Sequence, residues 1–266
     1  MTKVRDIMIL LIVKGFLIGF FMLFPGMSGG SIAIMLSEYN NIIKNTSTLF
    51  KNFKGSFFYL LALGIGGILG LYFSSFFITF ISKNYYNQML FFFLGIMLAF
   101  VISFIKINTK NIELNNIKYI LVGACLSILF NIIPEGFFFL ESWYNFFFLG
   151  IVLAVALILP GVSFTYVLLI FSCYDKLIFS IKNFDIEFLL KLSIALIIGI
   201  LLTIKVLEKI MNKNPQKTNL VLSGFIIGSF YMFFSKLNSI KEINVAVNFL
   251  MIGILFFLLF VKIFKK

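Results

Sequence analysis

Long apolar runs, separated by short polar segments, make up most of the chain. They form eight blocks, at 7–37, 57–81, 88–105, 117–133, 143–173, 188–206, 218–234 and 243–264. Most of these blocks come close to the 20 or so apolar residues that a helix needs to cross a hydrocarbon core of about 30 Å. The pattern therefore predicts an all-α polytopic membrane protein.

Two of the eight blocks, 7–37 and 143–173, are longer than the others and are interrupted. The first contains F-P-G-M-S-G-G-S around Pro25, and the second contains L-P-G-V-S-F-T around Pro160. A continuous helix of about 30 residues would be about 45 Å long, which is too long for a comfortable single span. We therefore expect a broken helix in each.

The order of the blocks, one interrupted and three plain, occurs twice. Residues 19–43 can be laid over residues 154–178 without a gap. This overlay matches Pro25 with Pro160, Gly26 with Gly161, Ser28 with Ser163 and Tyr39 with Tyr174. The repetition predicts two homologous halves, 1–135 and 136–266.

The distribution of Lys and Arg predicts that both interrupted blocks are re-entrant hairpins. If each enters and leaves on one side and the N-terminus is cytoplasmic, 16 of the 22 Lys and Arg face the cytoplasm. If both blocks span, the count becomes 11 of 22 on each side, and the usual positive-inside bias is lost. Three spans per half make the second half inverted relative to the first, as in many transporters. Both termini are then cytoplasmic.

The composition agrees with a membrane protein and excludes several function classes. Of 266 residues, 61% are hydrophobic and 12% are charged, against about 25% charged in soluble domains. The formal net charge of +12 is assigned to loops that set orientation and meet anionic headgroups, not to nucleic acid. With no His and two isolated cysteines, Cys125 and Cys173, we expect no metal, cofactor or disulfide.

The two interruptions are the candidate binding site. Irregular backbone at membrane depth is tolerated where it is buried in protein or lines a polar cavity. Proline ends a helix, glycine allows a tight reversal, and the returning helix, about 31–37 in the first half, directs free N–H groups at the tip. We expect two tips that converge at the midplane on a small anionic group. The residues are Pro25, Gly26, Ser28, Gly29, Gly30 and Ser31, with Pro160, Gly161, Ser163 and Thr165.

An alternative interpretation is that these small residues only allow close helix packing, as is common in membranes. We expect that role for the other glycine clusters, Gly64, Gly66, Gly67 and Gly70 in the first half and Gly224 and Gly228 in the second.

Three charged residues lie near the interrupted blocks. Lys14 is expected to extend to the cytoplasmic interface. Glu38 and Asp175 follow the returning helices, either as solvated hairpin ends or as carboxylates that couple transport to H⁺ or Na⁺.

The two motifs, FPGMSGGSIAIMLSEYNNII and LPGVSFTYVLLIFSCYDKLI, resemble the signature regions of a bacterial membrane family associated with polyprenyl-phosphate (undecaprenyl-phosphate) transport. It was formerly catalogued as a domain of unknown function. The resemblance covers essentially the whole chain. The second motif departs from the pattern at Phe164, where the family usually has a small residue after the serine.

The resemblance implies a multi-pass protein of the bacterial cytoplasmic membrane. Its substrate would be a carrier-lipid phosphate, moved from the outer to the inner leaflet for reuse in cell-wall synthesis. An undecaprenyl-pyrophosphate phosphatase is an alternative, but that similar family needs a loop Arg and paired glutamates. Here glycines follow Ser28, and Arg5 is the only arginine. A small-anion permease is a further alternative. The oligomeric state stays open.

Overall fold

The computed structural model describes residues 2–24, 26–108, 116–138, 143–231 and 243–264, and every regular element among them is a helix. The all-α expectation is therefore confirmed. The helices are α1 (Thr2–Met22), α2 (Gly29–Met35), α3 (Tyr39–Ser47), α4 (Phe53–Asn84), α5 (Tyr86–Asn108), α6 (Ile117–Ile132), α7 (Trp143–Ile158), α8 (Phe164–Ile170), α9 (Tyr174–Asn183), α10 (Ile186–Lys213), α11 (Pro215–Gly228) and α13 (Ile243–Phe264).

Four helices in the described part of the chain are long and apolar enough to cross a membrane: α4, α5, α10 and α13. The bent pair α8–α9 would be a fifth if it counted as one span. Helix α6 fills the expected block 117–133, yet its 16 residues extend about 24 Å, less than a hydrocarbon core.

Helix α11 differs from the expected span 218–234. It begins at Pro215, whose fixed φ suits a first turn, and it ends at Gly228. The next residue, Ser229, donates its hydroxyl to the carbonyl of Ile226 at 2.6 Å. Phe230 and Tyr231 are helical again, so the interruption is local to Ser229, where side-chain bonding to the backbone is known to bend helices.

Glycines bring the helices together in closely packed pairs. At Gly66 and Gly70 of α4, a Cβ atom would collide with the backbone of Ile12 and Phe16 in α1. At Gly224 and Gly228 of α11, it would collide with the backbone of α6. The packing role expected for these four glycines is confirmed. It fails for Gly64, where a Cβ would have nothing within 4 Å.

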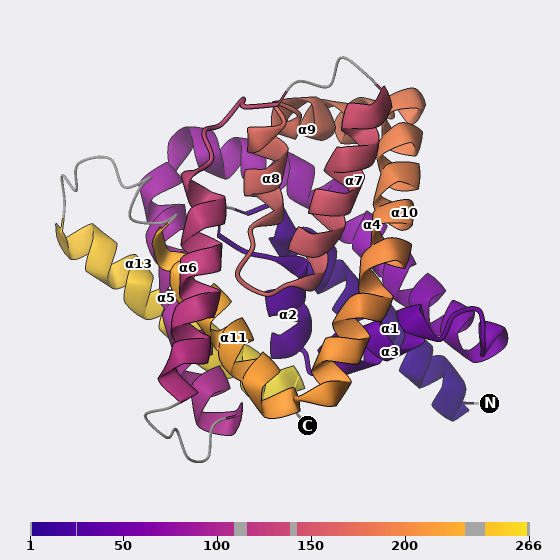
Figure 1. Ribbon diagram of the computed structural model, residues 1–266. Helices are drawn as coiled ribbons and strands as arrows, with labels where there is room; N and C mark the ends of the chain where they lie inside the picture. Colours follow the sequence, from indigo (N-terminus) through magenta and orange to yellow (C-terminus); the bar gives the residue numbers. More distant parts are fainter. Residues whose placement is uncertain (1, 25, 109–115, 139–142, 232–242, 265–266) are drawn as a thin grey trace.

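The closely packed pairs are distributed reciprocally over the two halves. Within the halves, α1 packs on α4 and α7 packs on α10. Between them, the second span of each half packs on the third span of the other, as α5 on α13 and α11 on α6. Figure 1 shows α2 and α8 in the interior, with α9 at the top of the view and α3 near the bottom, close to both termini.

Helices α3 and α9 have no counterpart among the expected elements. Each follows a short interior helix and is amphipathic, with Ile43 buried in α3 and Ile178 buried in α9. Helix α9 turns away from α8 by 109°. Each also packs against a long helix of the other half, α3 on α10 and α9 on α4.

Candidate functional site

The two interruptions have the same backbone conformation. Gly26 and Gly161 both have positive φ angles, 77° and 87°, which glycine adopts without the steric penalty of a side chain. Ser28 then caps α2 by accepting from the Ser31 amide at 3.1 Å. Ser163 caps α8 in the same way, from the Tyr166 amide at 3.3 Å. The expected Pro25 lies outside the described residues.

The far ends of α2 and α8 also match. Ser37 and Ser172, which the overlay pairs, have φ angles of 60° and 53°. In each half the amide of the next residue donates a hydrogen bond to a carbonyl of the preceding helix. The Glu38 amide donates to the Ala33 carbonyl at 2.8 Å, and the Cys173 amide donates to the Leu168 carbonyl at 2.9 Å. Two non-glycine residues at equivalent positions adopt this unfavourable conformation, which argues that the similarity of the halves is structural and not a chance of apolar composition.

The two tips meet in the interior. The Gly161 amide of the second tip donates to the Ser31 hydroxyl of the first at 3.2 Å. On the other side of that glycine, the Ser127 hydroxyl of α6 donates to the Gly161 carbonyl at 3.3 Å. At Gly30 a Cβ would collide with the carbonyl oxygen of Ile158, so glycine here permits α2 to lie against the end of α7.

The hydroxyl groups of the tips bond to one another. Ser28 and Ser31 are 2.9 Å apart between their Oγ atoms, and Ser163 Oγ lies 2.8 Å from Thr165 Oγ1. All four residues are at most 2% exposed. Phe164, which stands where a small residue was expected, is buried beside them. In this conformation the tips form a closed polar contact, and an anion between them would have to replace these bonds.

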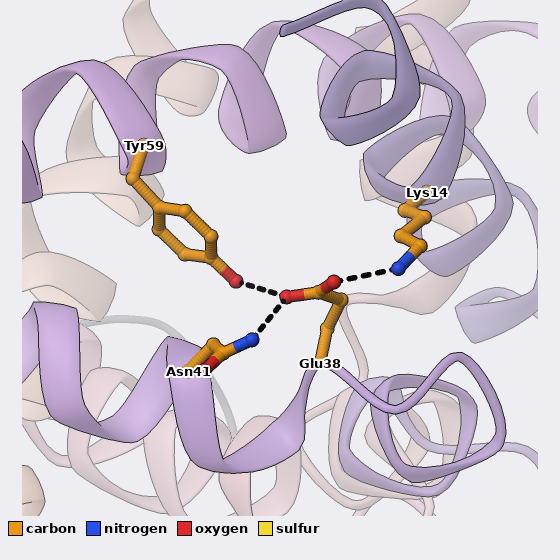
Figure 2. Close-up of polar contacts among 4 residues, drawn as sticks. All are labelled: Lys14, Glu38, Asn41 and Tyr59. Atoms are coloured by element: carbon orange, nitrogen blue, oxygen red, sulfur yellow. Dashed lines mark hydrogen bonds and ion pairs between the residues drawn. The ribbon is translucent and has the colours of Figure 1, made fainter. Parts of the chain in front are cut away.

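A second polar cluster, formed by Lys14, Glu38, Asn41 and Tyr59, lies beyond the far end of α2 from the first tip (Figure 2). Lys14 of α1 donates to Glu38 at 2.6 Å between Nζ and Oε1. The other carboxylate oxygen of Glu38 accepts from the Tyr59 hydroxyl at 2.7 Å and from the Asn41 amide at 3.0 Å. Lys14 and Glu38 are only 8% and 7% exposed, so each charge depends on the other.

The structure corrects two expectations about these charges. Lys14 does not extend to the interface, and Glu38 is not a solvated hairpin end, because the turn before α3 brings the carboxylate back against α1 and α4. Asp175, by contrast, is exposed in the first turn of α9. There a carboxylate is favoured by the helix dipole alone.

The cluster belongs to the first half only. The offset that overlays the two tips places Leu149 opposite Lys14 and Cys173 opposite Glu38. Both are completely buried, and both are neutral under ordinary conditions. The two halves therefore have similar tips, but the buried ion pair of Lys14 and Glu38 has no charged counterpart at the overlaid positions, Leu149 and Cys173.

Two polar cavities lie beside the ends of α2 and α3. One, of about 260 Å³, is lined by Ser37, Tyr39, Asn40, Ser103 and Asn219 among apolar residues of α5 and α13. The other, of about 500 Å³, lies between α3 and the α10–α11 junction, and it shares Asn40 and Asn219 with the first. Its wall includes the exposed residues Lys44 and Asn212, so it reaches the protein surface.

In the equivalent region of the second half, the carbonyls at the end of α8 are hydrogen-bonded to the segment after α6. Ile34 and Met35, at the end of α2, line the 260 Å³ cavity. At the end of α8 the matching carbonyls of Leu169 and Ile170 accept hydrogen bonds from the amides of Gly136 and Phe138, at 2.9 and 3.0 Å. Described residues between α6 and α7, Gly136 and Phe138, thus cover the end of α8, whereas the end of α2 lines a cavity.

Sequence reasoning missed several of these residues. Tyr59 looked like part of an apolar span, and Asn41 like part of a polar loop. Ser127 is a single polar residue in an apolar helix. Glu38 itself was a candidate, but its pairing with Lys14 was missed, and the signal that could have found it was the cost of a lone acid so close to an apolar hairpin.

Two known proteins and one protein family are similar to the chain over most of its length. It is 26% identical over 240 residues to a polyprenyl-phosphate transporter of Staphylococcus aureus, covering 84% of this chain and 85% of that one. It is 24% identical over 231 residues to a polyprenyl-phosphate transporter of Vibrio cholerae, covering 81% and 74%. No solved structure matches significantly. The model of one family matches residues 18–248. The chain therefore belongs to the VCA0040-like family, described as undecaprenyl phosphate translocase-like.

Proposed function

We propose that this protein transports undecaprenyl phosphate, or a similar polyprenyl phosphate, from the outer to the inner leaflet of the bacterial cytoplasmic membrane. The phosphate is held between the two tips while the prenyl chain stays in lipid or in apolar cavities. The family and its two named relatives support the substrate class. The single observation that supports the mechanism is the buried contact between Gly161 and Ser31, where the halves meet.

The chemistry of the tips suits a phosphate. The hydroxyls of Ser28, Ser31, Ser163 and Thr165 and the Gly161 amide already form hydrogen bonds with neutral partners. A charged acceptor makes hydrogen bonds about twice as strong as a neutral one. A phosphate that enters between the tips would therefore gain more than the protein loses when its own contacts separate.

Transport across hydrocarbon needs such a path, because an isolated charge in an apolar medium is very unfavourable. The hollowed end with Lys44 and the closed end with Gly136 and Phe138 support alternating access. Under the proposed inverted topology, with re-entrant hairpins at 7–37 and 143–173, the hollowed end faces the cytoplasm. The reciprocal helix pairs support two inverted repeats that rock around the tips.

We also propose that Glu38 couples this movement to H⁺ or Na⁺. A buried carboxylate that binds Lys14, Tyr59 and Asn41 changes all three contacts when it is neutralised. The exposed Asp175 has weaker support for such a role. Glu38→Gln is expected to change the dependence of transport on pH or Na⁺ while lipid-phosphate affinity stays within a few-fold. Unchanged pH and Na⁺ profiles would assign Glu38 to stability alone.

The substrate is tested by a binding assay with the purified protein in detergent. Undecaprenyl phosphate, undecaprenyl pyrophosphate and inorganic phosphate are compared as competing ligands. We expect the monophosphate lipid to bind more tightly than inorganic phosphate. Preference for inorganic phosphate would indicate a small-anion permease, and phosphate release from the pyrophosphate would indicate a phosphatase.

A further inference from the structure

The hydroxyl of Tyr39 is buried and has no hydrogen-bond partner among the described residues. Tyr39 begins α3, directly after Glu38, and it is 7% exposed. Buried hydroxyls are nearly always paired, because an unpaired one loses its bonds to water without replacement. This exception suggests that a ligand supplies the hydrogen-bond partner that the described residues do not.

The equivalent tyrosine of the second half has a partner. Tyr174 donates its hydroxyl to the carbonyl of Leu23, at the break after α1, over 3.4 Å. The overlay that matches the two tyrosines also matches Leu23 with Ile158, at the end of α7. Ile158 would therefore be the counterpart acceptor for Tyr39. Instead, Tyr39 and Ile158 both line a cavity of about 130 Å³.

Tyr39 separates two cavities of opposite character. Apart from Tyr39 and Thr46, the 130 Å³ cavity is lined by Gly, Ala, Leu and Ile residues, including Gly29 and Gly30 of the first tip. The 260 Å³ cavity, to which Tyr39 also contributes, has Ser37, Asn40 and other polar residues in its wall. An apolar cavity of this size stays dry and accepts small hydrocarbon groups. The pair of cavities fits a ligand whose polar head joins directly to a hydrocarbon chain.

We propose that the Tyr39 hydroxyl donates a hydrogen bond to the phosphate of a polyprenyl phosphate at a stage before the phosphate reaches the tips, with the phosphate in the polar cavity and the first prenyl unit in the 130 Å³ cavity. This inference rests on the proposed function and adds the residue that recognises the junction of head and chain. Tyr174 has the same role when the molecule opens at its other end, after its hydroxyl leaves Leu23. Tyr39 then closes onto Ile158, so that one tyrosine binds the backbone while the other binds the lipid.

The alternating roles predict opposite effects for two conservative substitutions. Removing an unpaired buried hydroxyl is neutral or stabilising, whereas removing a paired one loses a hydrogen bond. In the absence of ligand, Tyr39→Phe is therefore expected to keep or raise the melting temperature. Tyr174→Phe is expected to lower it.

The test is a binding measurement in detergent with farnesyl phosphate, a soluble prenyl phosphate, and with farnesol. Tyr39→Phe is expected to weaken binding of farnesyl phosphate about tenfold, since it removes one hydrogen bond to a charged group. Its affinity for farnesol is expected to stay unchanged. Tyr85→Phe is the control, because Tyr85 is exposed and lines neither cavity, and its affinity for farnesyl phosphate is expected to stay within about twofold of the wild type.

The outcomes separate this inference from the proposed function. If the wild type binds farnesyl phosphate and Tyr39→Phe binds it equally well, the hydroxyl is not in the site and only a water occupies it. If Tyr85→Phe weakens binding as much as Tyr39→Phe, the loss is not specific to the Tyr39 hydroxyl, and if Tyr39→Phe and Tyr174→Phe lower the melting temperature equally, the tyrosines do not alternate. If the wild type binds neither farnesyl phosphate nor undecaprenyl phosphate, the proposed function fails together with the site.

Discussion

The Gly161 amide and the Ser31 hydroxyl, 130 positions apart in the chain, form a buried hydrogen bond of 3.2 Å between the two halves. Ser31→Ala would leave that amide without its acceptor. A buried unpaired donor costs about 1–3 kcal/mol of stability, which thermal unfolding in detergent can measure. Ser74→Ala is the control, because the Ser74 hydroxyl is equally buried but has no hydrogen-bond partner among the residues that the structure describes. Equal melting temperatures for the two variants would contradict the contact between the tips.

The capping serines are expected to affect binding as well as stability. Ser28→Ala and Ser163→Ala should each weaken lipid-phosphate binding about 10- to 100-fold, if each hydroxyl bonds a charged group. Each also loses a helix cap, worth about 1 kcal/mol, so a moderate fall in melting temperature is expected too. Affinity and melting temperature are measured on the same samples. Normal affinity in both variants would remove these serines from the site and favour the packing interpretation.

The ion pair of Lys14 and Glu38 is expected to behave as one unit. Lys14→Met or Glu38→Gln alone leaves one buried group without its partner, at about 3–5 kcal/mol. The double variant should recover much of that loss. The exposed pair of Lys191 and Glu187 is the control, where single changes are worth about 0–1 kcal/mol. Additive losses in the double variant would show that the two residues act independently.

The topology can be tested by cysteine labelling in intact cells. The background variant carries Cys125→Ser, because Cys125 is exposed and Cys173 is buried. Lys51→Cys, before α4, and Phe179→Cys, in α9, both place a thiol at an exposed position. An impermeant reagent is expected to label Phe179→Cys from outside and Lys51→Cys only after lysis. Labelling of both from the same side contradicts the re-entrant hairpins.

The sequence predicted the elements that depend on local chemistry. Apolar run length located the helices, and the Pro-Gly-x-Ser motifs located both breaks, where Gly26 and Gly161 have the expected positive φ angles. The overlay also foresaw that the tips come together. These features follow from the conformational limits of proline and glycine and from the length of a hydrophobic span.

The remaining features depend on tertiary contacts that periodicity does not encode. The sequence left Glu38 open between a solvated hairpin end and a coupling carboxylate, because the left-handed turn at Ser37 that directs it to Lys14 has no signal of its own. Helix α3 was not predicted because most of its residues are polar, and only a few of them, such as Ile43, face the core. The sequence does not show the difference between Tyr39 and Tyr174, because it depends on a tertiary hydrogen bond to Leu23 that Tyr174 makes, whereas Tyr39 makes none among the described residues.

The central claim, that the protein moves a lipid phosphate between leaflets, is tested most directly in vesicles. Purified protein is reconstituted with undecaprenyl phosphate, and an impermeant phosphatase is added outside. Protein-free vesicles should release only the phosphate of the outer leaflet. Vesicles with the wild-type protein should release the phosphate of both leaflets, because lipid from the inner leaflet is carried out to the enzyme. If vesicles with the protein release no more phosphate than protein-free vesicles, so that only outer-leaflet lipid is hydrolysed in both, the account is contradicted.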